Sequence, residues 1–305
     1  MTTELATIQA QCSLPGVYYD IPAEVYHGAA GLSHSMQKHL NPPARLPVYL
    51  AEKGEPSVAM IMGTLVHAAI LEPDQPIPKV AIKPEGMKFS TNEGKFWRAQ
   101  AEKAGALIIP HDEWQDVKGM IESIANHAGC RELFLHGRSE VSLFAQVSDS
   151  VIGKARIDWL PGGGLSDSLA DIKTVSNQIG HEGGASMEEF SKTLFYQRYY
   201  TQAAWYLRLW NLLNPEQKRQ YFIFVAVEKT PPYLVALYHV DQEDLDLGSK
   251  QNDRDLRAYA EGLKTGVWRG YPEKCRKIKI PRREAMRLNN LEHKEWERAF
   301  AGGAA

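Results

Sequence analysis

The chain has 305 residues, of which 44% are hydrophobic and 24% are charged. This composition is typical of a globular protein with a large core, and no segment has the apolar length that a membrane span requires. The 35 basic and 37 acidic residues nearly cancel, so no overall basic excess indicates a nucleic-acid partner, although charge can still be concentrated locally. The three cysteines are scattered and form no CxxC pair, which makes a disulfide framework or a zinc site unlikely. A reducing cytoplasm is therefore the expected location.

The first part of the chain is predicted to be mostly helical. Proline ends several of its apolar runs, because proline cannot continue a helix. The segment 74–90 is rich in proline and predicts an irregular, exposed loop. The predicted helices are a short one capped by Ser33 or Ser35 and stopped by Pro42, an apolar one from Ser57 that is ended by Pro73, and two over 91–104 and 111–127.

The middle of the chain changes to the alternating pattern of strands. Residues 139–174 predict a three-stranded meander, with turns at 148–150 and at the PGGG of 161–164. The predicted elements that follow are one long helix over about 186–213, two strands joined by Pro231–Pro232, and a last helix that Asp241 caps and that runs to about Thr265. This order predicts an α/β fold in which a mixed central sheet is flanked by helices.

The segment SLADIKT, residues 168–174, ends an apolar run with a carboxylate and an ammonium. In a strand, positions two apart lie on the same face, so Asp171 and Lys173 are neighbours while Ile172 enters the core on the other face. This pair is either a surface ion pair or half of a metal-dependent hydrolytic site.

Asp158 supports the second interpretation. It interrupts the apolar run ARIDWL, where an acid is costly unless it is paired or binds a metal. Two carboxylates that converge suit Mg²⁺ or Mn²⁺, and a nearby lysine can orient water and stabilise charge on a phosphate. The alternative is that Asp158 lies in a turn and that Asp171 and Lys173 form an ordinary ion pair. The 13-residue separation of Asp158 and Asp171, on neighbouring predicted strands, favours the site.

Two helices add polar side chains to apolar surroundings. Tyr199, Gln202 and Tyr206 lie at helical spacing on one face, where aromatic residues usually mean core but a glutamine is harder to explain by packing. Glutamine and tyrosine can hydrogen-bond a phosphate or a catalytic water. His67 lies on an otherwise apolar helix and is either a packing histidine or a metal ligand.

Five elements in chain order resemble the PD-(D/E)xK nuclease superfamily, and within it the RecE (exonuclease VIII) nuclease domain, which is related to the RecB nuclease domain and to phage exonucleases. The opening segment 16–40 also looks like the start of RecE-type domains. The elements are Gly63-x-x-x-His67-x-x-x-Leu71-Glu72-Pro73, Glu140, Asp158, Asp171-Ile172-Lys173 and Gln202-x-x-x-Tyr206. The resemblance implies a restriction-endonuclease-like core over 16–270, between an N-terminal tail over 1–15 and a basic C-terminal extension over 271–305.

The resemblance also implies roles for these residues. His67, Asp158, Asp171 and the backbone carbonyl of Ile172 would hold the metal. Lys173 would position or activate the attacking water. Gln202 and Tyr206 would hold the substrate strand or the lysine, and Glu140 matches an acid near the metals. Some relatives carry a four-cysteine iron–sulfur cluster, which Cys12, Cys130 and Cys275 cannot supply, so no such cluster is expected.

The function that the resemblance implies is a Mg²⁺-dependent exonuclease on double-stranded DNA ends, with Mn²⁺ able to replace Mg²⁺. Digestion would run 5′ to 3′ and leave a 3′ single strand for phage or prophage recombination. The expected partners are a ring of identical subunits and a single-strand annealing protein, with no membrane. The alternatives are a nuclease on single-stranded or flap DNA, a non-catalytic scaffold that binds DNA ends, and a structural protein with metal-free ion pairs.

The segment 274–287 holds the densest run of basic residues in the chain and could bind DNA. The alternative is a solvated C-terminal face, which is the commoner meaning of such a run. The residues predicted to contact DNA are Arg156, Arg198, Lys277, Lys279, Arg282 and Arg283.

Overall fold

The computed structural model describes residues 14–52, 56–75, 78–176 and 184–280, with residues 282, 285, 286 and 288. The chain divides into two units, Met1–Arg269 and Gly270–Ala305. All helices and strands named below lie in the first unit. In the second unit, residues 270–280 contain neither helix nor strand. Among the described helices, none has the length and apolar character needed to cross a membrane.

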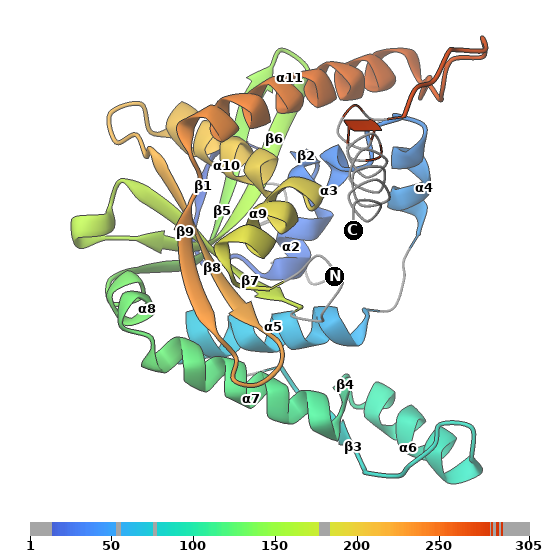
Figure 1. Ribbon diagram of the computed structural model, residues 1–305, viewed down its shortest axis with the longest axis vertical. Coiled ribbons are helices and arrows are strands. Elements are labelled where there is room, and N and C mark those ends of the chain that lie inside the picture. The colour runs from blue at the N-terminus through green and yellow to red at the C-terminus, as the bar shows by residue number, and fades with distance from the viewer. Residues whose placement is uncertain are drawn as a thin grey trace, which may run out of the picture. The chain divides into compact units, whose positions relative to one another are not determined.

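A mixed sheet forms the centre of the first unit (Figure 1). The strands β5, β6 and β7 pair antiparallel and confirm the predicted meander, whereas β7 and β8 pair parallel. The strand order is β1 (Gly16–Tyr18), β5 (Gly137–Ser148), β6 (Val151–Pro161), β7 (Ser168–Val175), β8 (Tyr221–Glu228) and β9 (Val235–His239), and the short β2 (Leu32–Ser33) pairs parallel with β6. A 3-10 turn over Gly163–Leu165 joins β6 to β7.

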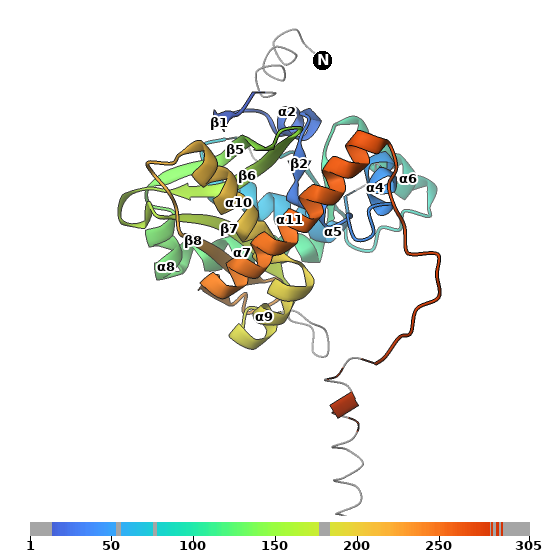
Figure 2. The ribbon, with the colours of Figure 1, turned by 90° about the horizontal axis from the view of Figure 1, so that it is seen from above.

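Helices cover both faces of this sheet. On one face lie α10 (Tyr199–Leu213) and α11 (Gln242–Thr265), and on the other lie α5 (Val58–Leu71), α7 (His111–Asn126) and the short α8 (Ala128–Leu133) (Figures 1 and 2). Each face has its own apolar cluster. Trp205 of α10 is fully buried in the first cluster and Met120 of α7 in the second. The apolar surface removed from water on the two faces is the main stabilising term of such a layered fold.

Side-chain caps fix where the helices begin. Ser33, Ser57, Thr91, Ser186 and Asp241 each accept a hydrogen bond from a backbone amide in the first turn of the helix that follows. Such caps contribute about 1 kcal/mol each. The capped helices are α3 (His34–Gln37), α5, α6 (Asn92–Lys103), α9 (Met187–Tyr196) and α11. The predicted starts at Ser33 and Asp241 are therefore confirmed.

The expected loop over 74–90 is wrong in part. Residues Val80–Lys83 form β3, which pairs parallel with β4 (Leu107–Pro110) in a separate two-stranded sheet. A four-residue strand next to several prolines carries little local signal, and its partner lies beyond α6 in the chain. Only this long-range pairing defines it as a strand.

The single helix predicted over 186–213 is also wrong, because α9 and α10 are separate helices. The break falls at Arg198, whose backbone is left-handed with φ +58°. This conformation is unfavourable for a residue with a side chain, and no neighbouring glycine or proline in the sequence indicates a break there. The two short helices that precede and follow β2 and α3 are α2 (Ala23–Gly28) and α4 (Arg45–Ala51).

Candidate active site

Three acids lie in a row across neighbouring strands of the central sheet. In the pairing of β5 with β6, Ser139 lies opposite Trp159 and Val141 opposite Ile157, so the intervening Glu140 and Asp158 face each other. Trp159 pairs with Ala170 of β7, and the next positions along these antiparallel strands are Asp158 and Asp171. Directly opposite residues of antiparallel strands have close Cβ atoms. The sheet register therefore brings together Glu140, Asp158 and Asp171.

The sheet is irregular at this row. Glu140 has φ +53°, and it lies inside β5, whereas the sequence pattern placed it at the start of the strand. Asp158 likewise lies inside β6, three residues before the end, and not in a turn. Ile157 packs on the α10 side of the sheet and Trp159 on the α5 side, although residues two apart normally share a face. The strands therefore twist sharply at the acids, and such irregularities often re-aim side chains at functional sites.

Strands β6 and β7 diverge beyond the acids, and Asp158 fills the gap. The start of β6 pairs with β2, and only Trp159 near its end pairs with β7. The backbone N–H of Ile172 in β7 donates to the side chain of Asp158, at Oδ2 and 3.1 Å, and not to the backbone of β6. The Asp158 carboxylate is thus fixed at the point where the sheet splits.

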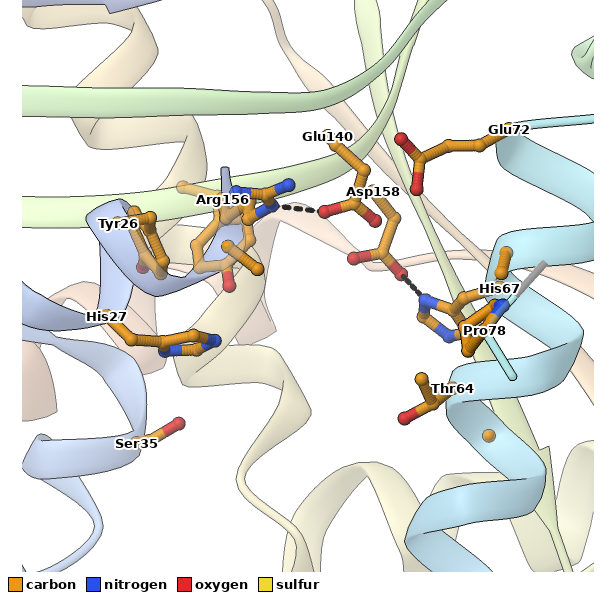
Figure 3. A pocket seen from close by; sticks show the side chains of 14 residues that line it. Tyr26, His27, Ser35, Thr64, His67, Glu72, Pro78, Glu140, Arg156 and Asp158 are labelled. Carbon is orange, nitrogen blue, oxygen red and sulfur yellow. Dashed lines mark hydrogen bonds and ion pairs between the residues drawn. The ribbon is translucent and has the colours of Figure 1, made fainter. Parts of the chain in front are cut away.

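His67 reaches this point from α5. Its Nδ1 lies 3.3 Å from Asp158 Oδ2, and its Nε2 lies 2.9 Å from the carbonyl oxygen of Ile172. One ligand atom each of His67, Glu140 and Asp158 lies within 4.8 Å of the other two. Figure 3 shows His67 and the two acids converging at one end of a pocket. The structure therefore brings together three predicted metal ligands, His67, Asp158 and the Ile172 carbonyl, with Glu140.

The donor set suits a divalent cation. Carboxylate and carbonyl oxygens with one imidazole are ligands for Mg²⁺ and still more for Mn²⁺, which accepts nitrogen more readily. Burial, reinforced by the neighbouring Asp171 charge, raises the pKa of Asp158 well above its usual range, against the opposing effect of Lys173. Burial lowers the pKa of His67, which keeps the imidazole neutral as a ligand must be. An ionised Asp158 would thus lack a compensating positive charge, which a cation could supply.

Asp171 has a different environment from Asp158. Its carboxylate is 1% exposed, with Oδ1 2.5 Å from Lys173 Nζ and Oδ2 accepting a hydrogen bond from Gln202 Nε2. Tyr206 lies four residues after Gln202 on the same face of α10. Gln202 and Tyr206 lie on the predicted face of α10, and Lys173 lies near the end of β7. Asp171 is thus held by the lysine and the glutamine, and its predicted role as a metal ligand stays a prediction.

Lys173 is held as an ammonium. Its Nζ lies over the rings of Tyr199, at 4.7 Å from the centroid, and Phe224, at 5.8 Å. Burial alone would lower its pKa, but the Asp171 carboxylate and the other nearby groups outweigh burial and raise the pKa above its usual value. A lysine that stays protonated can orient a water and stabilise developing negative charge, but it cannot accept a proton.

A pocket of about 540 Å³ opens beside these residues. Figure 3 shows His67 and Thr64 of α5 on one side and His27 and Ser35 on the other, with space between them. Gly63 and Thr64, one turn before His67 in α5, also line the pocket. Neither His27 nor Ser35 has a signal in the sequence as a site residue, because both reach the pocket through the packing of α2 and α3 against the sheet.

The arginines predicted to contact DNA already have protein partners. The Arg156 guanidinium lines the pocket, pairs with Glu140 and donates to the Ile21 carbonyl at 3.1 Å. Arg198 pairs with the buried Asp255 and donates to the Gln37 carbonyl at 3.1 Å. The structure thus gives Arg198 an internal structural role, whereas Arg156 still faces the pocket.

The predicted basic residues of the C-terminal segment lie in the second unit. Lys277, Lys279 and Arg282 are exposed, and Arg283 lies outside the described residues. Among the cysteines, Cys130 is buried and Cys275 exposed, while Cys12 also lies outside the described residues. Contact of the basic segment with DNA stays a prediction.

Comparisons with known proteins place this site in a family. The model of the PDDEXK-like domain of unknown function DUF3799 matches residues 33–281. The fold is similar to the crystal structure of a "putative exonuclease" from Eubacterium rectale, with a TM-score of 0.56 and 15% identity over 87% of this chain and 96% of that chain. No curated protein matches the sequence. Because the family model spans most of the chain and both the predicted sheet and the acid row are present, this protein belongs to the DUF3799 family of PDDEXK-like domains.

Proposed function

We propose that this protein is a metal-dependent nuclease that hydrolyses DNA phosphodiester bonds. The observation that carries the proposal is the row of three acids, Glu140, Asp158 and Asp171, with His67 beside Asp158 and Lys173 beside Asp171. Carboxylates that gather a divalent cation beside a fixed ammonium fit hydrolysis of a phosphate ester better than they fit a purely structural role.

A structural role is disfavoured by the state of Asp158. A buried ion pair that only stabilises a fold balances the charges of its two partners, as Asp171 and Lys173 do. Asp158 instead faces a neutral imidazole and another carboxylate, and its pKa is raised chiefly by burial. Such an arrangement costs stability in the protein alone and is explained by a ligand of opposite charge.

The chain's own groups have separable tasks in this proposal. When bound, a divalent cation would activate the attacking water and stabilise the leaving oxygen. Lys173 Nζ orients the water and stabilises charge on the phosphate, while Asp171 and the two rings hold the ammonium in place. Gln202 fixes Asp171 through its amide, and Tyr206 on the same helix lines the pocket.

The proposed substrate is the end of double-stranded DNA, degraded from 5′ to 3′ with Mg²⁺ in a recombination pathway. The resemblance to RecE-type domains and the likeness to the structure named as an exonuclease support this choice. We also propose a ring of identical subunits and a single-strand annealing partner on the same resemblance. A pocket walled by α5 on one side and by α2 and α3 on the other would admit one strand at a time.

The test is digestion of a set of labelled DNAs with Mg²⁺, with Mn²⁺ and with a chelator. The substrates are linear duplex labelled at either end, the same sequence as a closed circle, single-stranded DNA and a flap. The proposal predicts metal-dependent release of 5′ label as mononucleotides or short products from the linear duplex and an intact circle. Cleavage of the circle, or of single strands and flaps alone, would overturn the substrate choice, and no cleavage of any DNA would overturn the nuclease.

A further inference from the structure

Lys38 brings a second ammonium to the Lys173 side of the site. It is the C-cap residue of α3, and its Nζ lies 5.5 Å from the centroid of the Tyr199 ring. Lys173 Nζ lies 4.7 Å from the centroid of the same ring. The ring of Tyr199 in α10 therefore contacts two lysine ammonium groups. One comes from the end of β7 and the other from α3, in the N-terminal part of the chain.

The backbone around Lys38 is held firmly. His34 Nε2 lies 3.0 Å from Thr201 Oγ1 and 3.1 Å from the carbonyl oxygen of Arg198, which anchors α3 against the first turn of α10. The Arg198 guanidinium donates to the carbonyl of Gln37, the residue before Lys38, and pairs with the buried Asp255. A side chain on a clamped backbone is pre-organised, as binding residues need to be.

The cations here are unequally paired. Lys173 has Asp171 at 2.5 Å and Arg198 has Asp255, but among the described residues no carboxylate lies within ion-pair distance of Lys38. Burial, together with the like charges of Lys173 and Arg198, lowers the pKa of Lys38 to about 8, against the opposing effect of the more distant Asp171 carboxylate. Holding a half-buried ammonium beside two other cations costs free energy in the protein alone. The Tyr199 ring offsets this cost only partly, because a cation–π contact is weaker than a buried ion pair with a carboxylate.

We propose that Lys38 binds a backbone phosphate of the DNA strand, next to the phosphate that is cleaved beside Lys173. The inference rests on the proposed nuclease function and names a substrate-binding residue for it. The two ammonium groups on one ring would engage consecutive phosphates, with Lys38 completing its charge balance when DNA binds. The competing interpretation is that Lys38 only packs on Tyr199 and contributes to stability.

The test measures duplex binding in an Asp158→Asn background, so that the DNA stays intact. Fluorescence anisotropy compares Lys38→Met and Lys38→Arg with Lys118→Met, a matched change of an exposed lysine on α7, on the other face of the sheet. Lys38→Met is expected to weaken binding about tenfold, as loss of a charge-assisted contact does, with Lys38→Arg retaining most of the affinity and Lys118→Met unchanged.

A phosphate scan supplies the decisive comparison. Duplexes with a single neutral methylphosphonate at successive positions near the end are bound to the parent and to Lys38→Met. At one position, the methylphosphonate should weaken duplex binding by the parent about tenfold. The same methylphosphonate should not weaken binding by Lys38→Met any further, because that variant has already lost the contact. Lys38→Met that binds every duplex as tightly as the parent and is changed only in its melting temperature would overturn the inference. Equal weakening at every position would also overturn it.

The outcome for Lys38 is separable from the outcome for the nuclease. If the wild-type protein cleaves DNA and Lys38→Met binds normally, only the phosphate contact fails. If the wild-type protein neither binds nor cleaves any DNA, the proposed function itself fails. If Lys38→Met does not fold, the same methylphosphonate scan is done with Lys38→Gln, and Lys38→Arg remains the comparison.

Discussion

Asp158 and Asp171 occupy adjacent positions on neighbouring strands, yet their surroundings differ. Asp171 is 1% exposed, its Oδ2 accepts a hydrogen bond from Gln202 Nε2, and its Oδ1 forms an ion pair with Lys173 Nζ. The side chain of Asp158 is 15% exposed, accepts one backbone N–H and lies beside a neutral imidazole. The half of the site that contains Asp171 is therefore complete in the protein alone, and the half that contains Asp158 is not.

This difference separates two kinds of contribution to catalysis. The Lys173 half is rigid and charge-balanced, so it can present an ammonium without reorganisation during the reaction. The Asp158 half sets its carboxyl beside a neutral imidazole and not beside a cation, which makes it the candidate site for a divalent cation. Mutations in the first half should reduce turnover at any metal concentration, whereas mutations in the second should change the metal requirement.

Replacing Lys173 should reduce turnover more than any other single change. Lys173→Met should lower turnover on the order of a thousandfold, because it removes the charge nearest the reacting phosphate. The same change leaves Asp171 buried without its ammonium, which costs about 3–5 kcal/mol of stability. The measurements are single-turnover cleavage and thermal melting. The double variant Lys173→Met with Asp171→Asn should recover stability but not activity, and activity within a few-fold of wild type in either protein would contradict the assignment.

Replacing Asp158 tests the incomplete half. The raised pKa means that the folded protein binds more protons at Asp158 than the unfolded chain between about pH 4 and the raised value. The stability contribution from this group is therefore present at low pH and lost as pH rises through the raised pKa. A bound cation removes that loss, so the increase in melting temperature caused by Mn²⁺ should grow with pH.

The Asp158→Asn variant should remove most of that Mn²⁺-dependent increase while raising the metal-free melting temperature at neutral pH. Melting curves at several pH values, with and without Mn²⁺, measure both effects. An increase that is the same in Asp158→Asn as in wild type, at every pH, would place the cation elsewhere.

His67 should affect metal affinity more than turnover. Replacing it with glutamine removes the imidazole that contacts Asp158 and the Ile172 carbonyl, so the Mn²⁺ or Mg²⁺ concentration for half-maximal activity should rise by about 10–100-fold. A metal titration of activity measures this shift. A loss of thermal stability with an unchanged metal requirement would instead make His67 a packing residue.

Tyr206 and Gln202 should have intermediate effects. Tyr206 lines the pocket, and Tyr206→Phe keeps the ring, whose centroid is 5.9 Å from that of Phe222, but removes the hydroxyl. Turnover should fall several-fold with little change in melting temperature, because the phenol contributes one hydrogen bond to the site. Turnover should be lower still in Gln202→Ala, because this change also removes the hydrogen-bond donor to Asp171 Oδ2. Wild-type kinetics in Tyr206→Phe would leave the tyrosine a core residue only.

The basic segment should have the smallest effect on chemistry. Neutralising Lys277, Lys279, Arg282 and Arg283 together should leave single-turnover cleavage at saturating enzyme near the wild-type value. Each lost phosphate contact should reduce the salt dependence of binding by about one unit in the log–log slope. Binding measured across a salt series tests this prediction, and an unchanged slope would return the segment to a solvated face.

The strand half of the site is visible in the sequence because its signals are local. Asp171, Ile172 and Lys173 follow strand alternation, and Asp158 interrupts an apolar run, so both positions can be read from neighbouring residues. His67 was identified by its polarity on an apolar helix and by the resemblance to nuclease domains. The confirmed mixed sheet follows from the same alternation.

The N-terminal side of the site could not be predicted from the pattern. Lys38, His27 and Ser35 reach it only because α2 and α3 pack against the sheet and the first turn of α10. The break before α10 at Arg198 also depends on contacts with Gln37 and Asp255, which outweigh the local preference for one continuous helix. Long-range contacts of this kind leave no periodic signal in a single sequence.

Direct Mn²⁺ binding tests whether the Asp158 half of the site holds the catalytic cation. Calorimetric titration of the wild-type protein and of Asp158→Asn, at neutral pH and without DNA, is paired with cleavage of linear duplex at the same Mn²⁺ concentrations. We expect wild type to bind Mn²⁺ over the range in which cleavage appears, and Asp158→Asn to lose both binding and cleavage. Cleavage in the presence of a chelator, or Mn²⁺ binding in Asp158→Asn equal to that of wild type, would contradict this account.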